Sequence, residues 1–248
     1  MSSTSPDRAL ELAQRLAAVK TRISDAAASA GRPAPQLIVV TKYFPASDVE
    51  ALWNLGVRDV GENKAQEAEA KAADCACAGL NWHFIGQLQT NKAKSVAKYA
   101  HAVHSVDRPG LVSALAKAMA GENLRRAEAG VPGRGPLECF VQLDLRPAAD
   151  AAPGRGGAKP ADLTALADAV SQHPELRLAG VMAVAPLGED PGAAFGRLQE
   201  LSRVLVSRYP GANAISAGMS QDLEAAVQHG ATHLRIGSDV LGPRPAVG

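Results

Sequence analysis

The chain has 248 residues, 46% of them apolar, and a formal net charge of +1. This much apolar material builds a substantial core and excludes a disordered chain, while the length fits one large α/β domain or two small ones. The basic residues are dispersed, and no apolar run approaches the ~20 residues that span a bilayer, so neither a nucleic-acid partner nor a membrane partner is expected.

The N-terminal segment and the cysteines both predict a cytoplasmic protein. Segment 1–16 has no basic region followed by an apolar one, so it does not resemble a secretion signal. Cys75, Cys77 and Cys139 are odd in number and follow no framework spacing. We therefore expect free thiols in a reducing cytosol. No His or further Cys nearby completes a metal site with the first two.

The predicted elements alternate along the chain. Apolar residues at helical spacing predict an opening helix over 9–30. Strand-like runs follow at 37–41, 57–60, 82–85, 102–106, 137–143, 178–184, 214–216 and 232–236. Helical segments fall between them at 47–55, 63–73, 111–128, 161–173, 193–207 and 220–228. This order predicts a single-domain (β/α)8 TIM barrel over residues 1–248 with an extra N-terminal helix.

An open, doubly wound sheet is the alternative, but no glycine-rich fingerprint follows the first strand. The stretch 146–160, from Arg146 to Pro160, reads "RPAADAAPGRGGAKP" and predicts a mobile loop after the fifth strand. Two serines are candidate helix caps: Ser47, which has Glu50 three residues later, and Ser220, which is followed by acidic residues.

Lys42 ends the apolar run "LIVVTK", immediately before the turn "YFPAS". In (β/α) proteins the carboxyl ends of the strands and the loops after them build the active site. A lysine at this position is a solvated rim residue, a phosphate contact or an imine-forming amine.

Two later loops have the composition of phosphate sites. They read "SAGMSQD", from Ser216, and "RIGSDVLG", from Arg235, and they follow the seventh and eighth strands. Gly218 and Gly237 let backbone N–H groups approach an anion, and Ser238 offers a hydroxyl near a helix start. The alternative is that the glycines serve tight turns and the serines cap helices. We favour phosphate, because the loops stand at the ordinal positions that commonly hold it.

A lysine and a phosphate site at one barrel mouth predict a phosphorylated carbonyl ligand, either pyridoxal 5′-phosphate (PLP) or a sugar phosphate. Arg235 would enter this mouth from the last strand, and a surface ion pair is its equally weighted alternative. Because guanidinium only donates, it would require a facing pyridine nitrogen to be an unprotonated acceptor. His83 is expected to be a hydrogen-bonded histidine of the barrel core rather than a catalytic base.

Several motifs together resemble the YggS/PROSC family of PLP homeostasis proteins. They are "VVTKYFPA", "VGENKAQE", "WHFIGQLQTNKAK", "GVMAVAP" and "SAGMSQDLEAAVQHGATHLRIGSDVLGPR", in the family's order and over nearly the whole chain. The resemblance implies a barrel like the N-terminal domain of alanine racemase, with Lys42 forming a Schiff base with PLP.

The same resemblance implies the other cofactor contacts. Ser216, Gly237 and Ser238 match residues that hold the phosphate in relatives, and Arg235 matches the residue facing the pyridine nitrogen. Asn63 and Met182 match residues that line the cofactor. The chain departs from the family at Ser238, where Thr is usual, and at "PGRGGA", where a Ser/Lys/Gly motif is common.

The resemblance and the residues together favour a non-catalytic carrier that buffers PLP or delivers it to apo-enzymes. A racemase needs an acid/base on each face of the substrate carbon. In alanine racemases the second is a tyrosine from a second domain of the partner subunit, which this chain lacks. A monomer is therefore expected. The alternatives are a PLP-dependent amino-acid racemase and an aldolase-like Schiff-base enzyme without PLP.

Overall fold

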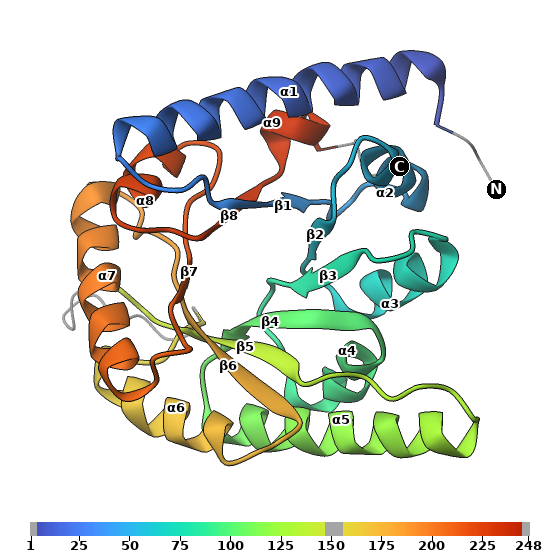
Figure 1. Cartoon of the computed structure of the whole chain (residues 1–248), viewed down its shortest axis with the longest axis vertical. Helices are drawn as coiled ribbons and strands as arrows, with labels where there is room; N and C mark the ends of the chain where they lie inside the picture. The colour runs from blue at the N-terminus through green and yellow to red at the C-terminus, as the bar shows by residue number, and fades with distance from the viewer. Residues whose placement is uncertain (1–3, 147–155, 245–248) are drawn as a thin grey trace.

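A computed structural model describes residues 4–146 and 156–244. Eight parallel strands form a closed barrel in which each strand pairs with the next and β8 pairs with β1 (Figure 1). The strands are β1 (Gln36–Val40), β2 (Asp59–Glu62), β3 (Asn81–Phe84), β4 (Ala100–Val106), β5 (Leu137–Gln142), β6 (Leu176–Met182), β7 (Ala214–Ser216) and β8 (His233–Ile236). The predicted (β/α)8 class and all eight predicted strands are confirmed, with bounds shifted by one or two residues in most cases.

Helices surround the barrel (Figure 1). They are α1 (Pro6–Ser29), α2 (Ala46–Asn54), α3 (Ala65–Asp74), α4 (Ala93–Tyr99), α5 (Pro109–Glu128), α6 (Leu163–Ser171), α7 (Pro191–Arg208), α8 (Leu223–Gln228) and α9 (Ser238–Leu241), with short turns η1 (Thr90–Lys92) and η3 (Pro160–Asp162). The predicted extra helix, α1, packs against α8 and α9. The Ser5 hydroxyl caps its first turn, and Pro6 opens it.

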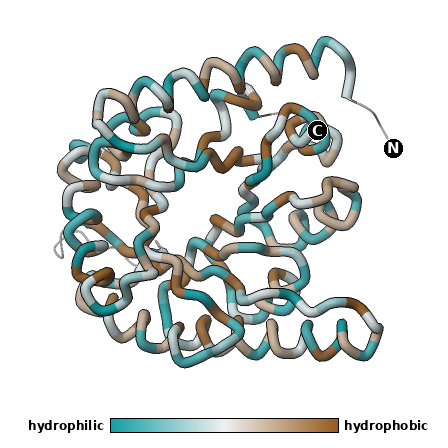
Figure 2. The backbone as a smooth tube through the Cα atoms, in the orientation of Figure 1, coloured by the Kyte–Doolittle hydropathy of each residue, from teal (hydrophilic) through white to brown (hydrophobic). Residues whose placement is uncertain are grey.

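The strands alternate their side chains between two cores. Outward residues such as Val39, Val181 and Ile236 pack against the helices, and α1 contributes Leu16 and Ile23 to the same core. A smaller apolar cluster lies inside the barrel and consists of Ala102, Phe140, Ala179 and Met182. Figure 2 shows apolar stretches along the strands, while α1 alternates between apolar and polar residues. Side chains therefore fill the barrel interior, which is not a pore.

Both predicted serine caps are wrong. Helix α2 begins one residue earlier than predicted, and its N-cap is Pro45. Ser47 lies inside the first turn, where its carbonyl accepts the Thr4 hydroxyl at 2.7 Å. The N-cap of α8 is Asp222, two residues beyond Ser220. No range was predicted for helix α4 or for the short helix α9, because their few residues carry too little periodicity; the helix start expected near Ser238 is that of α9.

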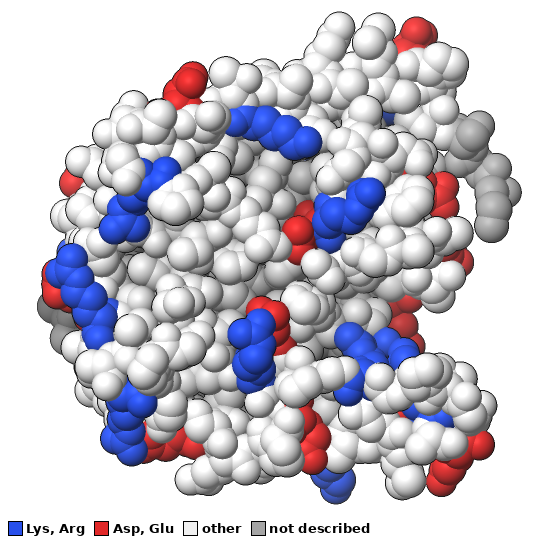
Figure 3. Space-filling model, in the orientation of Figure 1, with Lys and Arg blue, Asp and Glu red and all other residues white. Residues whose placement is uncertain are grey.

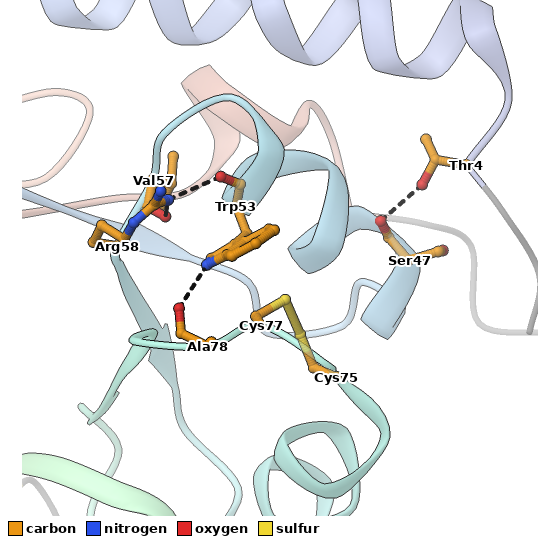
Figure 4. Close-up of a disulfide and its surroundings, with 8 residues drawn as sticks. All are labelled: Thr4, Ser47, Trp53, Val57, Arg58, Cys75, Cys77 and Ala78. Carbon is orange, nitrogen blue, oxygen red and sulfur yellow. Dashed lines mark hydrogen bonds between the residues drawn. A yellow bond between two sulfur atoms is a disulfide. The ribbon is translucent and has the colours of Figure 1, made fainter.

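The prediction of three free thiols is also wrong, because Cys75 and Cys77 form a disulfide in the loop after α3 (Figure 4). Their Cα atoms are 5.4 Å apart, within the range that a disulfide bridges. Only Cys139, buried in β5, is a free thiol among the described residues.

The predicted loop at 146–160 lies largely outside the described residues. Its final part returns to β5, where Leu143 and Ala158 form a parallel bridge. No helix among the described residues is long and apolar enough to cross a membrane. Lys and Arg side chains are spread over the face in Figure 3, interspersed with acidic ones, and form no continuous stripe there.

Candidate functional site

Lys42 follows β1 directly and lines a cleft of about 910 Å3 at the carboxyl ends of the strands. Its amine makes no hydrogen bond or ion pair with any described residue, and Nζ lies 5.8 Å from the centroid of the Tyr43 ring. The cleft therefore contains a primary amine to which no described residue forms a hydrogen bond or an ion pair.

The backbone at Lys42 is fixed by a buried ionic cluster outside the barrel wall. Lys71 of α3 donates to the Thr41 carbonyl at 3.1 Å and to Glu62 Oε1 at 2.5 Å, and the Thr41 hydroxyl donates to the same Glu62 oxygen at 2.7 Å. All three residues are buried. Burial raises the pKa of Glu62, and the nearby Lys71 ammonium opposes that rise. Thr41, the residue before Lys42, is thus held through both its side-chain hydroxyl and its backbone carbonyl.

Tyr43 continues this fixed turn in a conformation that is costly for a non-glycine residue. Its φ is +72°, in the left-handed region, and its N–H donates to Glu67 Oε1 at 3.3 Å. Three cations surround its ring, with the Arg244 guanidinium 3.8 Å and the Lys64 amine 5.5 Å from the centroid. These contacts hold the strained turn that presents the Lys42 side chain to the cleft.

The loops after β5 to β8 form the rest of the cleft. Its lining includes Val40, Ile85, Gln142, Gly156, Val184, Leu187, Met219, Ser220, Gln221, Arg235, Gly237 and Ser238. Four of the eight predicted site residues therefore meet in one cleft: Lys42, Arg235, Gly237 and Ser238. This grouping supports the prediction that the ends of β1 and β8 share a ligand.

The loop after β8 has the geometry of an anion site. Ser238 opens α9, and the amides of Ser238 and Asp239 donate to no acceptor among the described residues. The Ser238 hydroxyl lies 3.3 Å from that of Ser220. A Cβ on Gly237 would lie 3.3 Å from the Val40 carbonyl oxygen, so glycine lets β8 approach β1 closely here. The cleft lining thus brings together the open amide of Ser238 and the hydroxyls of Ser220 and Ser238.

Arg235 is buried inside the barrel, which excludes the surface ion pair. Its Nη1 donates to Ser216 Oγ at 2.7 Å and its Nη2 to the Ala183 carbonyl at 3.0 Å. Burial lowers the pKa of the guanidinium to about 10, so it remains charged near neutral pH. Arg235 is 5% exposed and lines the cleft, and its guanidinium has further N–H donors besides the two engaged here.

The other four predicted residues lie outside this lining. Ser216 is fully buried, and its hydroxyl bonds with Arg235 and with His104. Met182 is buried in the inner apolar cluster. Gly218 has φ +93°, and a Cβ there would come within 2.7 Å of Ala226 and Leu234. Asn63 lines a neighbouring cleft of about 890 Å3, and its buried Oδ1 has no partner among the described residues.

His83 is confirmed as a hydrogen-bonded histidine of the barrel interior. Glu62, Glu67 and Lys71 were missed as site residues. The only sequence signal was an acidic residue, Glu62, at the end of a predicted strand, followed by Lys71 in the next predicted helix.

Comparison with known proteins agrees with this geometry. Residues 14–245 match the family model "Alanine racemase, N-terminal domain". Proteins named "Pyridoxal phosphate homeostasis protein" are similar over nearly the full length. The one from Mycobacterium tuberculosis is 41% identical over 98% of this chain and 96% of its own length. The one from Escherichia coli is 34% identical over 94% and 97%.

Among solved structures, PipY of Synechococcus elongatus with PLP bound is 31% identical, with a TM-score of 0.76 over 93% of this chain and all of PipY. Alanine racemase from Corynebacterium glutamicum is 14% identical, with a TM-score of 0.64 over 97% of this chain but 62% of that enzyme. At that identity the likeness concerns the fold alone. The chain belongs to the alanine racemase N-terminal domain family and, within it, to the pyridoxal phosphate homeostasis proteins.

Proposed function

We propose that this protein binds PLP as a Schiff base on Lys42 and buffers or delivers it within the cytoplasm, without catalytic turnover. The observation that carries the proposal is the meeting in one cleft of Lys42, whose amine has no hydrogen bond or ion pair among the described residues, and Ser238, whose open amide begins α9. The structure of PipY with PLP bound, a relative matched over its whole length, supports the same ligand.

When bound, PLP supplies an aldehyde that condenses reversibly with an amine, a phosphate dianion and a pyridine ring. Lys42 would provide the amine. Gly237, Ser238 and the α9 amides would bind the phosphate through donors that need no rearrangement. Arg235 would donate to the ring nitrogen. Asn63, Met182, Ser216 and Gly218 stay predicted contacts, since they are buried beside the cleft or line its neighbour.

A carrier fits these residues better than a racemase. A guanidinium facing the ring nitrogen keeps that nitrogen unprotonated, which weakens the ring as an electron sink. The tyrosines are also engaged elsewhere. Tyr209 donates to Asp168, and the hydroxyl of Tyr99 is buried with a raised pKa. Tyr43 is held among three cations. None offers a second base opposite Lys42.

The test is covalent labelling at Lys42. The purified protein is titrated with PLP, followed by absorbance in the visible range, reduced with borohydride and mapped by peptide mass. We expect one reduced adduct, on Lys42, and we expect Lys42→Ala to lose it while keeping its circular dichroism spectrum. Lys64→Ala is the matched control, since Lys64 also lies beside the Tyr43 ring and is 60% exposed.

An adduct retained on another lysine in Lys42→Ala would refute the assignment. Turnover separates the carrier from the alternative racemase. Incubation of the loaded protein with single enantiomers of amino acids should leave them unchanged, and their steady conversion would replace the carrier with an enzyme. Delivery to apo-enzymes and the monomeric state are part of the same proposal and are measured by activation of an apo-enzyme and by sedimentation.

A further inference from the structure

A column of hydrogen bonds crosses the barrel interior from β2 to β8. Asp59 Oδ1 lies 3.0 Å from His83 Nε2, and His83 Nδ1 lies 2.9 Å from His104 Nε2. His104 Nδ1 lies 2.8 Å from Ser216 Oγ, which accepts Arg235 Nη1 at 2.7 Å. All five residues are at most 8% exposed. The column ends on the guanidinium that lines the ligand cleft.

The chemistry of the groups fixes the direction of these bonds. Burial raises the pKa of Asp59, but the bonds from His83 and Asn81 outweigh it and lower the pKa overall, so the carboxylate accepts. His83 must then donate from Nε2, which leaves Nδ1 to accept from His104 Nε2–H. His104 Nδ1 accepts from the Ser216 hydroxyl. Every donor therefore points from Arg235 towards Asp59.

The reverse direction is less favourable because it strands a proton. If His83 carried a second proton, it would donate to His104, whose Nδ1–H would donate to Ser216. Ser216 Oγ would then accept from both neighbours, and its own proton has no other acceptor among the described residues. A buried donor without a partner costs about 1–3 kcal/mol. Burial lowers the pKa of His104 well below its usual value, so this ring is uncharged in either direction.

We propose that Asp59, His83, His104 and Ser216 are positioning residues for Arg235, forming a one-directional hydrogen-bonded relay that holds its guanidinium in a single orientation towards the ligand. The inference rests on the proposed function only in naming that ligand as the ring of PLP. In this relay the Ser216 hydroxyl accepts from Arg235 and donates to His104.

Burial lowers the pKa of Arg235 and the charge of Asp222 opposes that change; the relay adds Asp59 as a more distant counter-charge. Arg235 makes its hydrogen bonds with neutral oxygens of Ser216 and Ala183. Aligned bonds polarise one another, so the negative charge of Asp59 strengthens the acceptor at Ser216. The fork formed by two fixed acceptors leaves the remaining guanidinium donors in one plane.

Other titratable groups face this relay from several strands. His101 of β4 stacks edge-on against His83 at 5.8 Å, and His233 of β8 lies 6.4 Å from His104. Glu138 of β5 accepts His101 Nε2 at 3.0 Å. Phe140 covers one side of His104, with the ring centroids 4.2 Å apart. Glu138 is therefore a matched acid near the relay that takes no part in it.

The first test reads the relay in the protein without ligand. Long-range proton–nitrogen spectra of 15N-histidine protein at neutral pH should assign His83 and His104 as uncharged rings, each protonated on Nε2 alone. Asp59→Asn should convert the His83 signal to a mixture of tautomers, and Glu138→Gln should leave it as in the wild type. Protonation of either ring on Nδ1 in the wild type would overturn the relay, whatever the ligand proves to be.

The second test reads the effect on Arg235. PLP affinity is titrated by absorbance in Asp59→Asn, His104→Phe and Glu138→Gln. We expect the first two to weaken the dissociation constant on the order of tenfold, a coupling of ~1.4 kcal/mol, and to shift the visible band, while the third leaves both unchanged. Unchanged affinity and band in folded Asp59→Asn would overturn the positioning role. Absence of PLP binding in the wild type would instead refute the proposed function and leave the histidine spectra as the test of the relay.

Discussion

Two buried cations stand beside the cleft and are neutralised in different ways. Lys71, outside the barrel wall, meets the Glu62 carboxylate directly at 2.5 Å. Arg235, inside the barrel, bonds only to neutral oxygens among the described residues and reaches Asp59 through three intervening side chains. In the direct pair, Lys71 and Glu62 neutralise each other and fix the backbone at Thr41. Arg235, whose carboxylate partner is distant, keeps guanidinium N–H donors for a ligand.

The two cations therefore have different roles: Lys71 supports the fold, and Arg235 is placed to recognise a ligand. The Lys71 cluster immobilises the turn that carries Lys42 without entering the cleft, and it leaves the Lys42 amine free of ionic partners. The Arg235 column holds a charge that does line the cleft. The direct ion pair of Lys71 and Glu62 therefore lies where it supports the fold and does not contact a ligand in the cleft.

The largest expected loss of stability comes from breaking the direct pair of Lys71 and Glu62. Lys71→Met would leave Glu62 buried without its cation, which destabilises a protein by about 3–5 kcal/mol. Urea unfolding measures the loss. Lys98→Met is the control, because its ion pair with Glu69 is half-exposed and contributes at most about 1 kcal/mol. The double variant Glu62→Leu/Lys71→Met should recover much of the loss, and equal losses in Lys71→Met and Lys98→Met would contradict the cluster's role.

A second direct pair sharpens the comparison through pH. Burial raises the pKa of Glu138, but the bond from His101 and the charge of Arg177 outweigh it and bring the pKa down from 4.5 to about 2. A lowered pKa stabilises the fold above pH 4.5, and this contribution is lost as the pH falls towards 2. At ~1.4 kcal/mol per unit it amounts to about 3 kcal/mol. Unfolding curves of wild type and Glu138→Gln should converge over this range, and parallel curves would contradict it.

The smallest effect is expected for the relayed cation. Arg235→Met removes a charge without stranding a carboxylate, because Asp59 keeps its bonds from His83 and Asn81. The cost is the unmet acceptors at Ser216 and Ala183, about 1–2 kcal/mol in urea unfolding. PLP affinity, in contrast, should fall in this variant. A loss as large as that of Lys71→Met would show that Arg235 supports the fold in the same way.

Position along the chain was enough to predict the parts of the site that follow strands. Lys42, Gly237 and Ser238 were expected at one barrel mouth and do line one cleft, since the first and last strands of a closed barrel are adjacent and β1 pairs with β8. The predicted roles of these residues are untested by the fold, and the single-domain organisation stays a prediction.

The supports could not be predicted, because they depend on which residues face one another across the barrel. His104 and Ser216 are 112 positions apart on strands that do not pair, and nothing local to either strand indicates the contact. Lys71 looks like an exposed charge on an alanine-rich helix, and only the packing of α3 on β2 buries it. The Cys75–Cys77 disulfide could not be predicted, because it depends on the conformation of the loop after α3, which composition does not determine.

The pairing of β1 with β8 has a consequence for assembly. Lys42 and Ser238 lie on opposite sides of the seam that closes the barrel, so neither a nascent chain nor an open intermediate has both halves of the cleft. A ligand that contacts both halves of the cleft binds only the closed barrel. It therefore raises the free energy of unfolding by mass action, in proportion to the logarithm of its concentration when it is in excess. The melting temperature of the whole barrel is therefore expected to report how much of that ligand is present.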